Sequence, residues 1–277
     1  MLIWQADFYR RPLGDTTGQP LWELLICDQS RNIEYLAFCP QSQANATWLT
    51  QQLQQATQTE KPDVIWVFRP QSLSLIEIAA ATLGIAVQPN RRTATLKQWL
   101  QQRVEDYPKL AGYTNEPYKP IDLDKPPPVP IPENLWGDVW RFATLPAGDI
   151  IDAFSDRPIP FLEMPDFLHP IHLKLPSTVA VPGIVINGGR QSMQLARWLG
   201  ENQPVSLHYI PGSLDGLILE AGLVDRWVLA TFADAEVSEA AKMFTERKQL
   251  TKGLHFLLVQ PDDSGMTYSG FWLLRPE

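Results

Sequence analysis

One stretch divides this 277-residue chain: Pro117-Tyr-Lys-Pro-Ile-Asp-Leu-Asp-Lys-Pro-Pro-Pro-Val-Pro-Ile-Pro132. Seven of its sixteen residues are proline. Because each proline fixes φ and removes a backbone donor, neither a helix nor a central strand is expected here, and an extended, stiff form is favoured. We therefore expect a spacer (residues 117–134) between an N-terminal domain (1–116) and a C-terminal domain (135–277). A peptide that docks in an aromatic-lined groove is the alternative.

The N-terminal flank predicts an α/β domain. Alternating apolar and polar residues predict a strand at 2–9. The mostly apolar segment 21–27 predicts a second, largely buried strand, and 33–39 is expected to pair with it as a hairpin. Apolar segments predict further strands at 64–68 and 85–87. Helices are expected to begin at the caps Asn45, Ser72 and either Thr93 or Thr95. The order β-β-β-α-β-α-β-α is that of the ribonuclease H-like fold with its mixed sheet. This analogy of topology does not settle function.

The ribonuclease H-like order invites a test for nuclease chemistry, which needs several carboxylates that converge on metal ions. Asp7 lies on the first expected strand, but the helix expected at 45–58 contains no acid. Arg69 follows the fourth strand, where a metal ligand would be required. One carboxylate does not make a metal site. We therefore expect no catalytic residue and no cofactor, and we expect Asp7 to be a hydrogen-bonded strand residue or an arginine partner.

Cations follow the ends of several expected strands in this half: Arg10 and Arg11 after the first, Arg69 after the fourth, Arg91 and Arg92 after the fifth. Open α/β sheets bind ligands at the carboxyl ends of their strands, and the planar fork of arginine suits phosphate. These five arginines, with Tyr9 as a stacking surface, are the candidate RNA-binding residues. A scatter of solvated loop charges is the alternative.

The C-terminal flank predicts a mixed α+β domain. Strands are expected at 139–144, 160–164, 183–187, 205–210, 217–221, 226–232, 254–260 and 269–274, with helices at 148–154, after Gly189 and after the cap Asp234. Gly188-Gly189, with Arg190 and Arg197 nearby, resembles an anion seat, but a tight turn with positive φ is favoured. His169 and His172 lack a nearby third ligand, so no zinc site is expected.

Composition limits the partners. Residues 1–120 contain 11 basic and 11 acidic side chains, whereas residues 121–277 contain 12 and 20, which accounts for the whole net charge of −8. Bulk electrostatics therefore do not hold nucleic acid, and any such binding needs a local patch. Cys27 and Cys39 fall out of register in the expected hairpin, opposite Glu34 and Trp22, and stay reduced. No apolar run suggests a membrane span, and no targeting segment is evident, so a cytoplasmic location is expected.

Several longer stretches resemble one known family, the chloroplast activators of translation of the psaB message and their cyanobacterial relatives (the Tab/Atab family). The similar stretches are Trp4-Gln-Ala-Asp-Phe-Tyr-Arg10, Leu21-Trp-Glu-Leu24, Val67-Phe-Arg-Pro-Gln71, Leu135-Trp-Gly137, Gly216-Leu-Ile-Leu-Glu-Ala-Gly-Leu223, Asp225-Arg-Trp227, Lys252-Gly-Leu-His-Phe-Leu257 and Ser269-Gly-Phe-Trp-Leu-Leu274. The resemblance implies an RNA-binding protein that prefers A/U-rich leaders and supports translation and photosystem biogenesis. Plant members carry a transit peptide, and this chain resembles a cyanobacterial, cytoplasmic member.

Three functions follow from these observations. The first is a non-catalytic protein that binds single-stranded A/U-rich RNA, with translation or photosystem assembly proteins as further partners. The second is a metal-dependent nuclease-like enzyme on a ribonuclease H-like scaffold. The third is an assembly scaffold that binds proteins through the acidic half and the proline segment. We favour the first, because the carboxylates that the second needs are missing.

Overall fold

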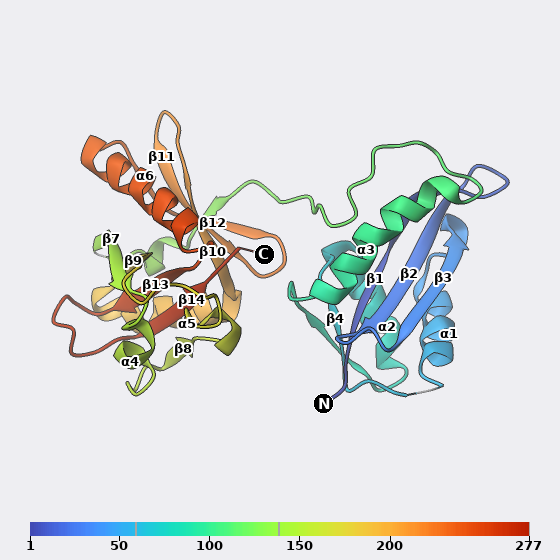
Figure 1. Ribbon diagram of the computed structural model, residues 1–277, viewed down its shortest axis with the longest axis horizontal. Coiled ribbons are helices and arrows are strands. Elements are labelled where there is room, and N and C mark those ends of the chain that lie inside the picture. Colours follow the sequence, from blue (N-terminus) through green and yellow to red (C-terminus); the bar gives the residue numbers. More distant parts are fainter. Residues whose placement is uncertain (59, 138, 277) are drawn as a thin grey trace. The chain divides into compact units, whose positions relative to one another are not determined.

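A computed structural model describes residues 1–58, 60–137 and 139–276. The chain divides into two compact units, Met1–Asp124 and Lys125–Glu277, and each is described by itself (Figure 1). Within the described residues the architecture is mixed α/β, with three mixed sheets and six α-helices.

The first unit contains the expected order of strands and helices: β1 (Ile3–Gly14), β2 (Pro20–Asp28), β3 (Glu34–Pro40), α1 (Ala46–Ala56), β4 (Val64–Val67), α2 (Pro70–Ala81), β5 (Ala86–Pro89) and α3 (Ala94–Asp106). They form one sheet in the order β3-β2-β1-β4-β5. The first three strands are antiparallel, whereas β4 and β5 run parallel to β1. In the β2–β3 hairpin Cys27 lies opposite Glu34 and Trp22 opposite Cys39, which confirms the predicted register.

Helices cover both faces of this sheet (Figure 1). On one face, α1 and α2 contribute Leu49, Leu53 and Ile76 to a core that includes Trp4 and Phe8 of β1. On the other face, α3 packs Leu96, Trp99 and Leu100 against Leu25, Cys27 and Phe68. The side chain of Asp7 lies on this second face because side chains alternate along β1.

The starts of the three helices test the predicted caps. Asn45 caps α1, and its side chain accepts a hydrogen bond from the Trp48 N–H at 3.0 Å, as predicted. The prediction of Ser72 as the cap of α2 is wrong, because the helix begins at Pro70, whose fixed φ suits the first helical position. The Ser72 hydroxyl instead donates to the carbonyl of Arg69. Thr93 precedes the first residue of α3.

The second unit holds two further sheets: β10-β11-β12-β6 and β7-β9-β13-β14-β8. Its elements are β6 (Val129–Pro130), β7 (Val139–Pro146), α4 (Ile150–Phe154), β8 (Phe161–Glu163), β9 (Ala180–Asn187), α5 (Ser192–Asn202), β10 (Pro204–Ile210), β11 (Asp215–Ala221), β12 (Asp225–Phe232), α6 (Ala235–Leu250), β13 (His255–Gln260) and β14 (Gly270–Leu274). Every strand and helix expected from the sequence is present, and β6 is an addition. Asp234 caps α6 as predicted.

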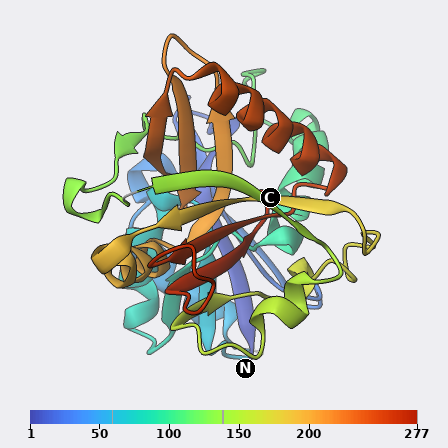
Figure 2. The same ribbon diagram turned by 90° about the vertical axis from the view of Figure 1, so that its left-hand side faces the viewer.

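The core of the second unit joins both sheets to two helices. Leu217 and Leu219 of β11 pack with Ile184 of β9, Leu195 of α5 and Phe244 of α6. Figure 2 faces this unit, in which α6 contacts β7 and β9 of one sheet and β10 of the other.

The proline-rich stretch is largely built into the two units. Pro120 is buried in the first unit, which continues to Asp124 rather than ending at residue 116. Val129–Pro130 forms β6 at the edge of a sheet, a position that tolerates proline because one side needs no ladder bond. Ile131 and Leu135 enter the core of the second unit.

Candidate nucleic-acid interface and the Asp7 cluster

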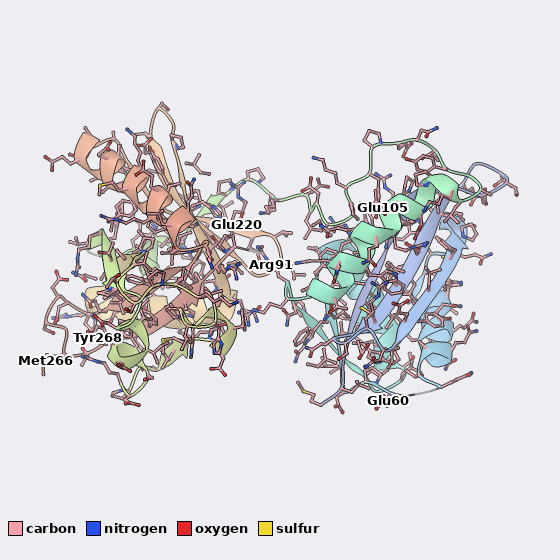
Figure 3. All side chains as sticks on the ribbon, viewed as in Figure 1. Glu60, Arg91, Glu105, Glu220, Met266 and Tyr268 are labelled. Atoms are coloured by element: carbon pink, nitrogen blue, oxygen red, sulfur yellow. The ribbon has the colours of Figure 1, made fainter. Side chains whose placement is uncertain are left out.

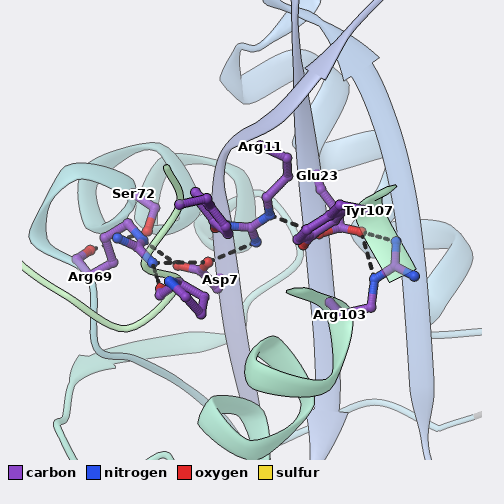
Figure 4. Close-up of polar contacts among 9 residues, drawn as sticks. Asp7, Arg11, Glu23, Arg69, Ser72, Arg103 and Tyr107 are labelled. Atoms are coloured by element: carbon purple, nitrogen blue, oxygen red, sulfur yellow. Dashed lines mark hydrogen bonds and ion pairs between the residues drawn. The ribbon is translucent and has the colours of Figure 1, made fainter. Parts of the chain in front are cut away.

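Asp7 lies in β1 with two guanidinium groups on its carboxylate (Figure 4). Arg69 Nε donates to Oδ1 at 2.7 Å, and Arg11 Nη2 donates to Oδ2 at 2.9 Å. Arg11 is placed by β1 itself, four residues after Asp7, and Arg69 comes from the residue just before α2. The side chains of Asp7 and Arg11 are completely buried, and that of Arg69 is 3% exposed.

The same network continues to Glu23 in β2. Glu23 accepts hydrogen bonds from Arg11 Nε at 2.7 Å, from Arg103 Nη2 at 2.6 Å and from the Tyr107 hydroxyl at 2.6 Å. We call the seven residues of this network the Asp7 cluster: Asp7, Arg11, Glu23, Arg69, Arg103, Tyr107 and Tyr118.

The proline-rich segment closes the Asp7 cluster. The Tyr118 hydroxyl accepts from Arg11 Nη1 at 2.6 Å, and the carbonyl of Pro120 accepts from Arg69 Nη2 at 2.6 Å. These bonds span 107 and 51 residues of sequence. They give partners to guanidinium donors that would otherwise be buried without one, a costly condition.

The electrostatics of the cluster follow from burial and proximity. Burial alone would raise the pKa of Asp7, but Arg69 and Arg11 outweigh it and hold the pKa below its usual value. Burial likewise disfavours the charged form of Arg11, yet the Asp7 carboxylate raises its pKa well above the usual value. Burial raises the pKa of Tyr107, so its hydroxyl remains a donor. Three arginines and two carboxylates give the cluster a formal charge of +1.

This arrangement does not suit a metal ion. Both oxygens of Asp7 already accept from arginine, and Arg69 introduces a positive charge beside them. Across residues 1–58, 60–137 and 139–276, no group of three or more His, Cys, Asp or Glu side chains is placed to hold a metal. The prediction that Asp7 is an arginine partner is confirmed.

The six predicted RNA-binding residues occupy three kinds of position. Arg11 and Arg69 are buried in the Asp7 cluster, where their donors bind protein groups instead of facing solvent. Tyr9 is half-buried, and the Arg69 guanidinium lies 4.2 Å from the centroid of its ring. Arg10 is exposed, and the prediction that Arg10 and Arg11 follow the end of the first strand is wrong, because β1 extends to Gly14.

Arg91 and Arg92 lie in the loop that joins β5 to α3. Figure 3 labels Arg91. The carbonyl of Arg91 accepts from Lys97 Nζ at 2.6 Å, and the Arg92 N–H donates to Asn90 Oδ1 at 2.8 Å. These contacts fix the backbone of the loop. In the sheet order, β5 is two places from β1, so the structure does not gather all six predicted residues at one strand end.

Four members of the cluster were not among the predicted site residues: Glu23, Arg103, Tyr107 and Tyr118. One signal was available for Glu23, because an acid within the apolar run 21–27 requires a buried partner. A signal was also available for Arg103, which lies four residues after Trp99 and seven after Leu96 and therefore falls on the apolar stripe of α3. Tyr118 belongs to the stretch that was predicted to be a spacer.

The predicted anion seat at Gly188-Gly189 is a tight turn. The Gly188 N–H donates to the carbonyl of Gln260 and the Gly189 N–H to that of Pro261, so both donors already have partners. Gly189 has φ of 51°, which confirms the preferred interpretation.

Comparison with known families identifies the chain. Residues 3–103 match the model described as "RNA-binding protein Tab2/Atab2 N terminal", and residues 118–275 match that of "RNA-binding protein Tab2/Atab2, C-terminal domain". The chain belongs to the Tab2/Atab2 family. Two curated relatives are both named "Protein TAB2 homolog, chloroplastic". That of Arabidopsis thaliana is 30% identical over 98% of this chain and 74% of its own length, and that of Zea mays is 31% identical over 98% and 70%.

Solved structures give weaker likenesses. The catalytic core domain of HTLV-2 integrase with magnesium gives a TM-score of 0.27 at 17% identity, over 39% of this chain and 74% of that one. A chain of the simian T-cell lymphotropic virus intasome in complex with the PP2A regulatory subunit B56 gamma gives a TM-score of 0.24 at 14% identity. The match covers 51% of this chain and 64% of that one. Neither likeness is high enough to assign a fold. Within the part of this family member that the structure describes, no helix has the length and apolar character needed to cross a membrane.

Proposed function

We propose that this chain is a non-catalytic RNA-binding protein that binds single-stranded A/U-rich RNA and supports translation of photosystem messages. The observation that carries the proposal is that both halves match models of a family described as RNA-binding. The A/U preference and the role in photosystem biogenesis follow from the family resemblance. The proposal keeps a cytoplasmic, cyanobacterial setting, whereas the two curated relatives are named chloroplastic.

We infer that the first unit has a ribonuclease H-like fold. The strand order β3-β2-β1-β4-β5 and the parallel placement of β4 and β5 beside β1 support this inference. In a nuclease with such a fold, further carboxylates would surround the strand position that Asp7 occupies here. Here arginines surround Asp7 instead, and this supports the proposal that the first unit binds RNA without cleaving it.

The proposed contacts with RNA lie on β1, within the strand, and in the loop that follows β5. Arg10, Arg91 and Arg92 are proposed to contact phosphates, and Tyr9 is proposed to stack on a base. Arg69 and Arg11 are assigned a supporting role, because their buried ion pairs fix the strand that carries Tyr9 and Arg10. The Arg69 guanidinium over the Tyr9 ring restrains the orientation of that ring.

Fluorescence anisotropy with labelled single-stranded RNA at several salt concentrations tests this function. The wild-type chain is expected to bind A/U-rich RNA more tightly than G/C-rich RNA. The variant Arg10→Gln is expected to bind several-fold more weakly and to reduce the slope of log affinity against log salt by about 0.7, the amount for one phosphate contact on a single strand. The variant Lys119→Gln, which removes an exposed cation elsewhere in the same unit, is the matched control.

Each outcome has a separate meaning. If the wild type binds no RNA, the proposed function is wrong. If Arg10→Gln binds with an unchanged slope, the function stands and the assignment of Arg10 is removed. If the chain purifies with partner proteins and without an enriched transcript, the scaffold hypothesis replaces RNA binding.

A further inference from the structure

The second unit contains an apolar cavity of about 410 Å³, and none of its lining residues belongs to the Asp7 cluster. It lies between β12 and β6 of one sheet and β7 and β9 of the other. Its floor is aliphatic, with Ile184 and Ile186 of β9, Leu195 of α5 and Leu217 of β11. All its lining residues belong to the second unit.

Two tryptophans form an aromatic wall of this cavity. Trp136 is 57% exposed, although it is among the largest apolar side chains of the protein. Its indole Nε1 donates to the carbonyl of Ile131 at 3.2 Å, which restrains the ring. The ring centroid of Trp140 lies 5.5 Å from that of Phe142, in an edge-on contact, and 5.4 Å from that of Phe232. These contacts also restrain the Trp140 ring. Restrained, accessible rings bind flat ligands with little loss of side-chain entropy.

A strand edge forms another wall. Strand β12 pairs with β11 from Asp225 to Phe232, but its parallel pairing with β6 covers only Trp227 and Val228. The Ile131 N–H then donates to the carbonyl of Val228. In the described part of the chain no strand continues this edge along Leu229–Thr231, and these residues line the cavity. A strand edge presents backbone donors and acceptors to whatever lies beside it.

These features suit one chemical class of ligand. A nucleobase has apolar faces that stack on aromatic rings and a polar edge that forms hydrogen bonds with backbone groups. An aliphatic chain cannot form hydrogen bonds with the backbone groups of the strand edge. The acidic excess of residues 121–277, with 12 basic and 20 acidic side chains, disfavours binding through phosphates alone. Residues 118–275 match the model of the C-terminal domain of a protein described as RNA-binding.

We propose that this cavity holds one unpaired base of the bound RNA, stacked on Trp136 with its polar edge toward Leu229–Thr231. The inference rests on the proposed function, since it names the site by which the second unit contributes to RNA binding. Binding here depends on stacking and backbone contacts, so it is expected to depend little on salt. The Arg10 contact differs in this respect, because it involves a phosphate.

Two variants of the full chain test the base site in opposite ways. Trp136→Ala removes one of the two tryptophans of the aromatic wall, the one proposed to stack on the base, and Ala230→Phe adds bulk to a residue that lines the cavity. Both are expected to weaken binding of A/U-rich single-stranded RNA about tenfold, the loss typical of one stacked base, with an unchanged salt slope. Trp136→Phe keeps an aromatic face and is expected to retain most of the affinity. Ile171→Ala, which alters a residue 77% exposed elsewhere in the unit, is the matched control.

Photocrosslinking of the wild-type chain provides a readout that does not depend on the folding of any variant. RNA containing 5-iodouridine is expected to crosslink to a peptide that contains Trp136 or Trp140. Crosslinks confined to other peptides would overturn the base site, and so would full affinity in both Trp136→Ala and Ala230→Phe. Absence of RNA binding by the wild type would instead remove the proposed function and the base site together. An apolar dye that binds the cavity and is not displaced by RNA would assign it to another ligand.

Discussion

At the scale of single residues, the chemistry of Asp7 is set by the two arginines that bind its carboxylate. Its carboxylate is shared by Arg69 and Arg11, and its charge is therefore used to neutralise buried guanidinium groups. A buried carboxylate with two cations is expensive to desolvate and expensive to disrupt. The Asp7 carboxylate therefore stabilises the fold through its ion pairs with Arg69 and Arg11.

Removal of the Asp7 charge is expected to destabilise the first unit strongly. In Asp7→Asn, two buried guanidinium groups lose their carboxylate, which costs roughly 3–5 kcal/mol in the free energy of unfolding. Urea unfolding of the variant and the wild type measures this cost. Asp122→Asn makes the same chemical change in an exposed pair with Lys119 and is expected to stay within about 0.5 kcal/mol of wild type. Equal losses in the two variants would contradict the account.

Lys248 of α6 predicts a pH dependence of the second unit. Burial lowers its pKa to about 8, while its Nζ donates to the carbonyl of Leu207. Because the folded chain releases this proton near pH 8 and the unfolded chain near 10.5, the unfolded state binds more protons between these values. The contribution of Lys248 to stability therefore rises with pH across this window, by about 3 kcal/mol in total.

The variant Lys248→Met isolates this contribution. The wild-type minus variant difference in unfolding free energy, measured by urea titration from pH 7 to 10.5, is expected to increase with pH. Lys242→Met, which removes an exposed lysine of the same helix, is the matched control and is expected to change the free energy of unfolding by about 0.5 kcal/mol or less at pH 7. A constant difference for Lys248→Met would show that its proton is not released in this range.

Much of the site follows from sequence by simple periodicity, and part of it does not. Alternation along β1 places Asp7, Tyr9 and Arg11 on one face, so the meeting of Asp7 with Arg11 was predictable. The burial of Arg11 was not, because Tyr118 closes the cluster from 107 residues away. Pairing across such a distance depends on tertiary structure, which local patterns do not contain.

At the scale of elements, patterned strands and polar caps were predictable and proline-containing segments were not. Asn45 and Asp234 cap their helices as expected, because each carries an oxygen that reaches free N–H groups of the first turn. The sequence did not indicate β6, since prolines reduce any strand propensity and only its two-residue pairing with β12 defines it. A different property of proline explains the start of α2 at Pro70, because its fixed φ suits the first helical position.

Gly183 of β9 is expected to be required for the packing of its sheet. It pairs with Phe256 of β13, and a Cβ at this position would lie 2.5 Å from ring atoms of that residue. Gly183→Ala is therefore expected to destabilise the second unit by about 1–3 kcal/mol. Gly216→Ala in β11, where the nearest atom would be 3.7 Å away, is the matched control with a change of about 0.5 kcal/mol or less. Thermal unfolding followed by circular dichroism compares the two, and similar shifts would contradict this reason.

At the scale of the whole molecule, the two units have different chemical characters. Residues 1–120 are balanced in charge and enclose the Asp7 cluster, whereas residues 121–277 are acidic and enclose an apolar cavity with an aromatic wall. We propose that RNA is bound by phosphate contacts on the first and by base stacking on the second. Phosphate contacts on one unit and base stacking on the other would together allow an acidic protein to bind an anionic polymer.

The central claim is that the chain holds RNA without cleaving it, because arginines surround Asp7. The most direct measurement is to incubate end-labelled A/U-rich RNA with the protein and Mg²⁺ or Mn²⁺, recover the protein-bound RNA and determine its length on a denaturing gel. The account predicts that the bound RNA remains full-length at every metal concentration. Shorter products that require the metal and disappear in Asp7→Asn would contradict it.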